Sequence, residues 1–329
     1  MTLTEVLASS DADGQEQGDA LNAQAMNEVH QQLSRIPRFA GTPPEAFAIK
    51  GLGGLTNKNY KVIVDGESYM LRIAGEGTGE YIDRKAEAVN AKVAIEADVN
   101  VEVLFFEAGN GLQLTRFIEG AATLDAERFK NMDSVARAAR AFRKIHSCGD
   151  LFANEFNIFT MVDEYLVLLK KKGARIPDGY EEVQAEAEAV RAALATRPAG
   201  LVPCHCDPVA ENFLDTGERM YIVDWEYAGN NDPMWDLGAL SVEAEFDADQ
   251  DAALMESYFE GQPPADQVGR MVMYKAMSDL LWTLWAVIQV VNENPVEDFR
   301  AYGLGRFERC KALMASPVFA GHLVAACDG

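Results

Sequence analysis

Residues 204–213, CHCDPVAENF, place a histidine, an aspartate, a glutamate and an asparagine within one short stretch that contains a proline. Cysteines flank His205 on both sides, so a metal site is the first chemistry to consider. A structural zinc site needs four ligands, however, and only the Cys-His-Cys cluster is evident, so the cysteines are better explained as small apolar groups around a loop. The offsets of Asp207 and Asn212 indicate phosphate chemistry instead.

Phosphoryl transfer needs a carboxylate that orients or deprotonates the attacking hydroxyl, an amide and a second carboxylate that hold magnesium, and a cation on the nucleotide phosphates. The sequence offers Asp207 as the base, Asn212 at the start of a predicted strand, and Asp224 at the end of the next strand. Upstream, Arg72 is the candidate cation, and Glu87 in the following helix could orient it. Each group alone has an ordinary explanation, such as a cap, a loop or a surface ion pair, so only the combination is specific.

A glycine-bearing turn, GLGGLTN at 51–57, lies upstream of these groups. Its backbone N–H groups could cover phosphates, because glycine allows close approach. The same glycines could also merely shape a hairpin.

The elements that must position these groups form two predicted lobes. Alternating apolar residues and turn signals predict one helix over 81–97 and strands over 47–52, 60–64, 68–74, 101–108 and 112–118. The pair Asp65-Gly66 between two of the strands is a strong hairpin signal. After 118–122 the pattern becomes helical, near 125–147, 160–172 and 180–196, with two short strands over 212–216 and 220–225 and more helices to the end.

We therefore expect an α+β, bilobal fold, with a small N-terminal antiparallel sheet lobe carrying one helix and a larger, mostly helical C-terminal lobe. The expected divisions are 1–40 for an acidic arm and a helix, 41–117 for the sheet lobe and 118–329 for the helical lobe. A chain of 329 residues also exceeds the usual ceiling for a single hydrophobic core.

Composition narrows the setting. A formal net charge of -23 would repel nucleic acids and anionic membranes, so neither is an expected partner. The five cysteines have no repeating spacing, and no basic residue precedes Arg35, which argues against disulfides and a secretory signal. The longest apolar run, 280–291, is too short to span a bilayer and predicts a buried helix. These features predict a cytoplasmic protein without membrane insertion.

The segments HCDPVAEN, IVDWEYAGNNDPMWDLG and GGLTNKNYKV resemble the choline/ethanolamine kinase family, within the aminoglycoside-phosphotransferase and protein-kinase-like superfamily. The resemblance covers residues from about 45 to 315. It implies a protein-kinase-like fold, ATP and Mg²⁺ as cofactors, Asp207 as the catalytic base, His205 as a support of the catalytic loop, and Asn212 and Asp224 as magnesium ligands. The residues it implies for the ATP site are Gly53, Gly54, Thr56, Asn57, Asn59, Arg72 and Glu87.

The sequence departs from its relatives at three places. Protein kinases have lysine where this chain has Arg72, but arginine at this position is familiar among choline kinases. The difference therefore favours the choline kinases within the superfamily. Glu211, beside Asn212, is a bulky anion where many relatives have a small residue. The extension over 1–40 has no assigned counterpart.

Aromatic residues predict the acceptor. Trp282 and Trp285 lie three residues apart and hence on one helical face. Tryptophan faces attract quaternary ammonium groups, and several aromatics usually form the cage that binds choline. Tyr227 and Trp235 could complete such a cage, and choline kinases have a similar tryptophan pair followed by a glutamine. The alternative is that these aromatics are simply core.

The predicted function is therefore ATP- and Mg²⁺-dependent phosphorylation of choline to phosphocholine. A kinase for ethanolamine or another amino alcohol is the first alternative, because a primary ammonium prefers hydrogen-bond acceptors. An aminoglycoside-type phosphotransferase comes next, and an inactive nucleotide-binding module last, because such a module has no need of Asp207. The partner is a small molecule in either kinase reading, and no oligomeric state follows from the sequence. The carboxylates left as further candidates for the pocket are Glu226, Asp232 and Asp236.

Overall fold

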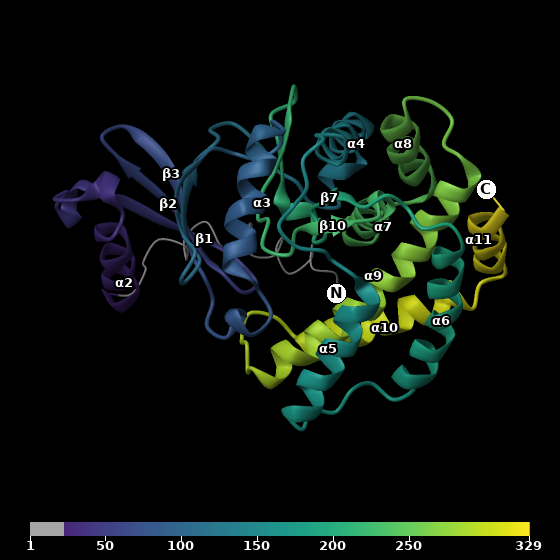
Figure 1. The fold of residues 1–329 in the computed structure, drawn as a ribbon. Coiled ribbons are helices and arrows are strands. Elements are labelled where there is room, and N and C mark those ends of the chain that lie inside the picture. Colours follow the sequence, from purple (N-terminus) through teal and green to yellow (C-terminus); the bar gives the residue numbers. More distant parts are fainter. Residues whose placement is uncertain (1–22, 329) are drawn as a thin grey trace.

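The computed structural model describes residues 23–328, so more than half of the arm and helix predicted over 1–40 lies outside the described residues. A smaller lobe built on a sheet and a larger lobe built of helices lie side by side (Figure 1). The predicted α+β, bilobal architecture is therefore confirmed.

The sheet lobe contains five antiparallel strands in the order β1-β2-β3-β5-β4. The strands are β1 (Ala48–Gly53), β2 (Lys58–Val64), β3 (Glu67–Ile73), β4 (Val103–Glu107) and β5 (Leu112–Arg116). Asp65 and Gly66 join β2 to β3, and both have positive φ, as a two-residue hairpin turn requires. The five strands and this hairpin agree with the sequence prediction.

Two helices flank the sheet. Helix α2 (Ala23–Ser34) shares the smaller of two hydrophobic clusters with strand residues. Helix α3 (Arg84–Glu96) follows the hairpin as predicted, but its buried Ala91 and Ala94 belong to the larger cluster, which fills the helical lobe. Helix α3 therefore joins the two lobes instead of packing on the sheet alone.

The helical lobe surrounds one long helix. Its helices are α4 (Met132–His146), α5 (Ile158–Lys171), α6 (Tyr180–Thr196), α7 (Pro233–Glu243), α8 (Ala248–Phe259), α9 (Ala265–Val291), α10 (Phe299–Met314) and α11 (Pro317–Asp328). Helix α9 has the length and hydropathy to cross a membrane, but 83% of its apolar window is buried inside the protein. It is thus the buried helix that its apolar run predicts, extended at its N-terminal end to Ala265.

Short strands hold the stretch that opened the sequence analysis. One small sheet has the order β6 (Ala122–Thr123), β8 (Phe213–Asp215), β9 (Met220–Ile222), and β7 (Val202–Cys204) pairs with β10 (Gly229–Asn231). The sequence predicts β8 and β9 but not β6, β7 or β10, because runs of two or three residues carry no readable periodicity.

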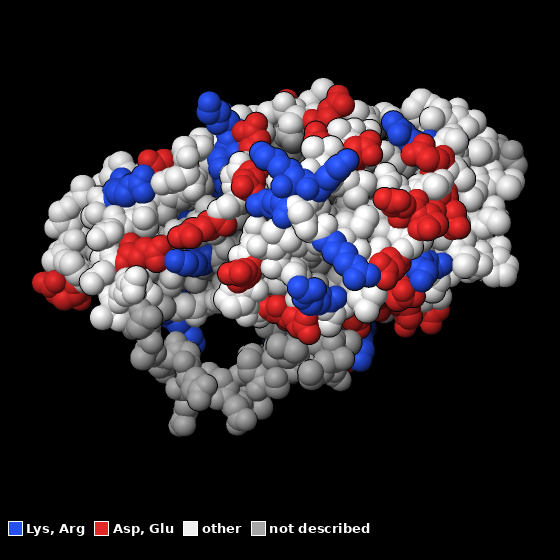
Figure 2. Space-filling model, turned by 90° about the horizontal axis from the view of Figure 1, so that it is seen from below, with Lys and Arg blue, Asp and Glu red and all other residues white. Residues whose placement is uncertain are grey.

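The surface charge is mixed on the face seen in Figure 2. Basic side chains gather there in small groups beside acidic ones. The net charge of -23 is therefore not expressed on this face as one continuous acidic surface.

Candidate active site

The loop that carries Asp207 is held in place by the buried carboxylate of Asp236 on α7. The backbone N–H groups of His205 and Cys206 donate to the two oxygens of Asp236, at 2.7 and 2.8 Å. The ring of His146 contacts the same carboxylate at 3.0 Å. Cys206 has a φ of 69°, so the chain turns sharply just before Asp207. Asp236 is fully buried and shapes the loop; it does not line a pocket.

His205 ties this loop to the segment that leads to Asp224. Its ring is buried, and its Nε2 lies 2.8 Å from the carbonyl oxygen of Val223, to which it donates. Burial lowers the pKa of His205, which keeps the ring neutral at neutral pH. These contacts suit the supporting role that the family resemblance implies.

Asn212 and Asp224 lie on neighbouring segments. The side-chain amide of Asn212 donates to the carbonyl oxygen of Asp207 at 3.0 Å, which leaves its Oδ1 available to another partner. The Val223 N–H donates to the Asn212 carbonyl at 2.9 Å, so the two segments run together. The prediction that Asp224 ends a strand is wrong: β9 ends at Ile222, and Asp224 has a φ of 65° in the following loop.

Arg72 and Glu87 form the predicted pair, and it is buried. The Arg72 guanidinium contacts the Glu87 carboxylate and also donates to Asp224 Oδ1 at 2.7 Å. The Arg72 side chain is only 5% exposed and that of Glu87 is fully buried, so this pair is not a surface ion pair of negligible worth.

A second arginine, Arg84, extends this network and escaped the sequence analysis. Its Nη1 lies 2.7 Å from Glu87 Oε2 and 2.8 Å from Glu226 Oε2. Asn57 of the glycine turn donates to the same Glu226 oxygen at 3.1 Å. Glu226 is therefore committed to Arg84 and Asn57. The spacing of Arg84 and Glu87, three residues apart on a predicted helix, was the available signal.

The turn over 51–57 lies beside these groups and depends on its glycines. Gly53 and Gly54 both have positive φ, and a Cβ on Gly54 would come within 2.3 Å of the Asn57 carbonyl oxygen. A Cβ on Gly75 would come within 2.1 Å of the Thr56 carbonyl oxygen, and Asn59 pairs with Gly53 across the strands. The predicted ATP-site residues are therefore close neighbours.

The aromatic residues predicted for the acceptor separate into two groups. The rings of Tyr227 and Trp282 meet edge to face at 5.1 Å between centroids, and those of Trp282 and Trp285 at 6.1 Å. Both indole N–H groups are buried and have no hydrogen-bond partner among the described residues. Burial raises the pKa of Tyr227, and negative charges that include Asp207 add to the shift. The cluster therefore lies within electrostatic reach of Asp207.

Further aromatic residues at this cluster went unnoticed in the sequence. The ring of Tyr81 stacks on Tyr227 at 6.3 Å, and Tyr165 lies edge to face with Tyr81 at 6.4 Å. From α10, Phe299 and Tyr302 pack against Trp285. These four residues come from three separate parts of the chain, so no local spacing links them to Trp282 and Trp285.

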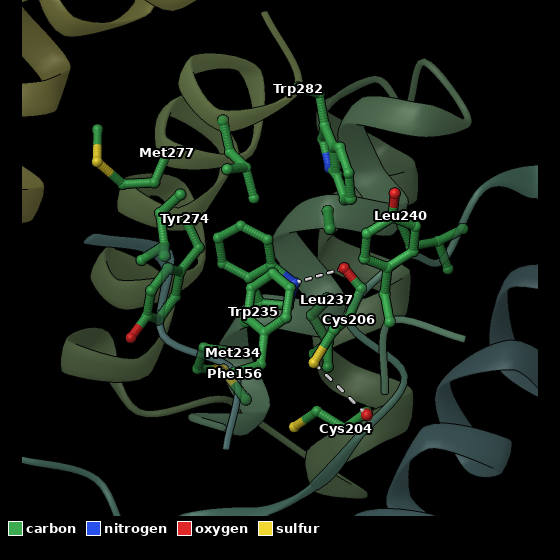
Figure 3. Close-up of a cluster of buried hydrophobic side chains, with 14 of the residues drawn as sticks. Phe156, Cys204, Cys206, Met234, Trp235, Leu237, Leu240, Tyr274, Met277 and Trp282 are labelled. Carbon is green, nitrogen blue, oxygen red and sulfur yellow. Dashed lines mark hydrogen bonds between the residues drawn. The ribbon is translucent and has the colours of Figure 1, made fainter. Parts of the chain in front are cut away.

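Trp235 does not join this cluster. It is fully buried, packs against Phe156 and Tyr274, and donates from Nε1 to the Cys206 carbonyl oxygen at 3.0 Å (Figure 3). Asp232 is likewise enclosed, since it caps α7 and pairs with a buried arginine, Arg270. Trp235 and Asp232 both hold the N-terminal end of α7 in the core. The prediction that Trp235 forms part of the aromatic cage is therefore not supported.

Among the described residues, Cys204, His205 and Cys206 do not form a group whose ligand atoms lie close enough to share a metal ion. The thiols of Cys204 and Cys206 lie near backbone carbonyl oxygens, and burial raises the pKa of both. A different trio, His146, Cys204 and Asp236, has its ligand atoms within 4.8 Å of one another. Three ligands fall short of a structural zinc site, and the oxygens of Asp236 already accept backbone N–H groups.

Carboxylates gather around Asp207. Burial raises the pKa of Asp207 well above the usual aspartate range, and the charges of Glu243, Asp224 and Glu226 add to the shift while Arg306 opposes it. Burial also raises the pKa of Asp224. Carboxylate and amide oxygens are the ligands that Mg²⁺ prefers, so the side chains of Asn212 and Asp224 fit this ion.

Glu211 lies toward Glu243. It is half-buried, and its pKa is raised by burial, with the charge of Glu243 contributing. Glu243, at the end of α7, accepts two hydrogen bonds from Arg306, at 2.6 and 2.5 Å. The sequence analysis did not identify Glu243, and it noted Glu211 as a bulky anion beside Asn212 without assigning it a role.

The raised pKa of Asp207 predicts a pH dependence of stability. The folded protein holds this proton more tightly than the unfolded chain, so the free energy of unfolding should fall as pH rises from about 4 through the raised pKa. In urea titrations without metal or nucleotide, Asp207→Asn should match the wild type near pH 4 and be more stable at pH 8. A variant that is less stable than the wild type at pH 8 would contradict this assignment.

The fold and these groups define a phosphotransferase of the protein-kinase-like class. The profile of the choline/ethanolamine kinase family matches residues 49–262. The crystal structure of a choline/ethanolamine kinase family protein from Mesorhizobium loti is 50% identical, with a TM-score of 0.82, and the match covers 92% of this chain and 99% of that one. The chain therefore belongs to the choline/ethanolamine kinase family and transfers phosphate to an alcohol group.

Relatives of both substrate types are similar to this chain. Choline kinase LicA from Streptococcus pneumoniae is 28% identical, with a TM-score of 0.76, over 89% of this chain and 99% of that one. Ethanolamine kinase 1 of Mus musculus is 25% identical over an alignment of 296 positions that covers 78% of this chain and 80% of that protein. Membership of the family therefore does not decide between choline and ethanolamine as the substrate, and the residues of the acceptor pocket must be considered.

Proposed function

We propose that this enzyme phosphorylates choline to phosphocholine, with ATP and Mg²⁺. The observation that carries the proposal is the cluster of Tyr227, Trp282 and Trp285 within electrostatic reach of Asp207. Aromatic faces attract a quaternary ammonium group by cation–π interaction. Such a group has no N–H to donate, so it suits aromatic faces better than hydrogen-bond acceptors.

The charges around the pocket support a cationic acceptor. The charge of Glu243 acts on both Asp207 and Glu211. The guanidinium of Arg306 forms ion pairs with Glu243 and Asp279, which offset its positive charge. An excess of negative charge around Asp207 lowers the electrostatic cost of binding a monocation near it.

In this reaction Asp207 orients the choline hydroxyl and accepts its proton as the γ-phosphoryl group is transferred. The burial that raises its pKa also makes it a stronger base than an ordinary aspartate. Arg72, oriented by Glu87, contacts the nucleotide phosphates, and the turn over 51–57 covers them. Asn212 and Asp224 would hold magnesium, which offsets phosphate charge when it is bound.

Ethanolamine is the second candidate, and one observation favours it. Tyr165 places a buried hydroxyl at the aromatic cluster, where its ring lies edge to face with Tyr81 and its hydroxyl interacts with Tyr227. A primary ammonium group could donate to this oxygen, whereas the trimethylated group of choline cannot.

Methylation of the acceptor separates the two candidates. We expect kcat/KM, measured as ADP release with Mg²⁺ and ATP, to rise from ethanolamine through its monomethyl and dimethyl forms to choline. The total gain should be about tenfold or more, which corresponds to a cation–π contact of about 1–2 kcal/mol. An aminoglycoside in the same panel serves as the control and should give no rate above background.

A rate that falls with methylation would make this an ethanolamine kinase and return the two tryptophans to the core. A rate that is highest with the aminoglycoside would overturn both candidates.

A further inference from the structure

The loop after α9 reaches across to the turn over 51–57, here called the phosphate turn. Asn294 Nδ2 donates to the Leu55 carbonyl oxygen at 2.9 Å and to Gln289 Oε1 at 3.1 Å. The Leu55 side chain packs against the larger hydrophobic cluster of the helical lobe. The tip of the phosphate turn is thus held to the other lobe by one polar and one apolar contact.

The amide of Asn294 is fixed in this orientation by its own loop. Its Oδ1 accepts the Val296 N–H at 3.1 Å, while its backbone N–H donates to the Gln289 carbonyl oxygen at 3.1 Å. The Oδ1 atom of Asn294 therefore stabilises its own loop, whereas the Nδ2 atom makes the contact with Leu55. The two roles can be separated by substitution.

The same contacts lead to the aromatic cluster. Gln289 lies one turn after Trp285 on α9 and is buried. Its Nε2 lies 3.5 Å from the hydroxyl of Tyr81, a long hydrogen bond, and the ring of Tyr81 stacks on Tyr227. A continuous series of contacts therefore runs from the phosphate turn to the predicted acceptor pocket.

We propose that Asn294 is a positioning residue that couples the phosphate turn to the acceptor pocket, so that nucleotide and acceptor each strengthen the binding of the other. The location of the acceptor rests on the proposed function. A turn rich in glycine loses much conformational freedom when it closes over a ligand, and a contact that holds it in place beforehand reduces that loss. An acceptor that orders Tyr81 and Gln289 would order Asn294 as well, and such coupling is reciprocal.

The test is Asn294→Asp in the full chain. Aspartate keeps the size of the side chain and the oxygen that accepts from Val296, but it cannot donate to Leu55. We expect the Kd for MgADP to rise roughly threefold to tenfold, the range of one hydrogen bond. We also expect choline to tighten MgADP binding less than it does in the wild type. Both are measured by calorimetric titration of MgADP with and without choline.

Asn292→Asp is the matched control. Asn292 lies in the same loop, is exposed, and accepts only a long hydrogen bond from Lys172 Nζ at 3.3 Å. It introduces the same charge without touching the phosphate turn, so its MgADP affinity and coupling should equal those of the wild type. Asn294→Ala serves as a second variant and should behave like Asn294→Asp.

Wild-type values for both quantities in Asn294→Asp would overturn the proposal. A weaker Kd with unchanged coupling would overturn the link to the acceptor pocket. Failure of the proposed function is a different result: choline would then not bind to the wild type, and the coupling is measured with the amino alcohol that the enzyme does phosphorylate.

Discussion

Replacing Asp207 with asparagine is expected to lower kcat by roughly 10²- to 10⁴-fold, the usual contribution of a positioned general base. The amide has nearly the same shape but cannot accept the acceptor's proton. The contacts of Arg72 and of the phosphate turn do not involve the Asp207 side chain, so the affinity for MgADP should stay within a few-fold of the wild type. ADP release and MgADP titration measure the two quantities.

Asp215→Asn is the control for this substitution. Asp215 is a buried carboxylate at the end of β8 that pairs with Arg137 and Ser134, away from the phosphate turn. Its loss should reduce stability but leave turnover per folded molecule unchanged. Residual turnover of Asp207→Asn near the wild-type level would remove the role of base from this residue.

Replacing Trp282 with leucine is expected to raise the KM for choline roughly threefold to thirtyfold, the range of a partly desolvated cation–π contact. Leucine keeps the site apolar but removes the ring that meets Tyr227 edge to face. The KM for ATP should change by less than twofold, because Trp282 does not contact the phosphate turn. Initial rates with either substrate varied give both constants.

Phe307→Leu is the matched aromatic control. Phe307 is buried on α10 and stacks on Tyr180, outside the cluster with Tyr227. This substitution should lower stability without changing the KM for choline relative to the KM for ATP. Equal rises in the choline and ATP constants for Trp282→Leu would show that this tryptophan is part of the core only.

The sheet lobe could be predicted closely because its strands alternate apolar and polar residues and its hairpin carries Asp65-Gly66. The Arg72–Glu87 contact could also be anticipated, since strand and helix are adjacent in the chain. The short strands β6, β7 and β10 could not, because their pairing depends on distant partners. Their hydrogen bonds form only once the helical lobe brings them together.

The site was less predictable where its residues come from distant segments. Trp235 was assigned to the cage because it follows Asp224 closely, but the start of α7 turns it toward Phe156 and Tyr274. Asn294 was missed instead, because nothing near it in the sequence indicates a contact with Leu55. Periodicity finds the face of an element, whereas the neighbour on that face is set by tertiary packing.

The ion pair between Arg72 and Asp224 gives the Asp224 carboxylate an internal counter-ion. While the guanidinium balances this carboxylate, a cation arriving alone meets a site whose charge is already partly compensated. In the proposed reaction, nucleotide phosphates would offer Arg72 a second partner, and the Asp224 carboxylate would then need another cation to balance its charge. With the roles proposed above for Arg72 and Asp224, exchange of one counter-ion for another would give a physical reason for metal and nucleotide to enter this site together.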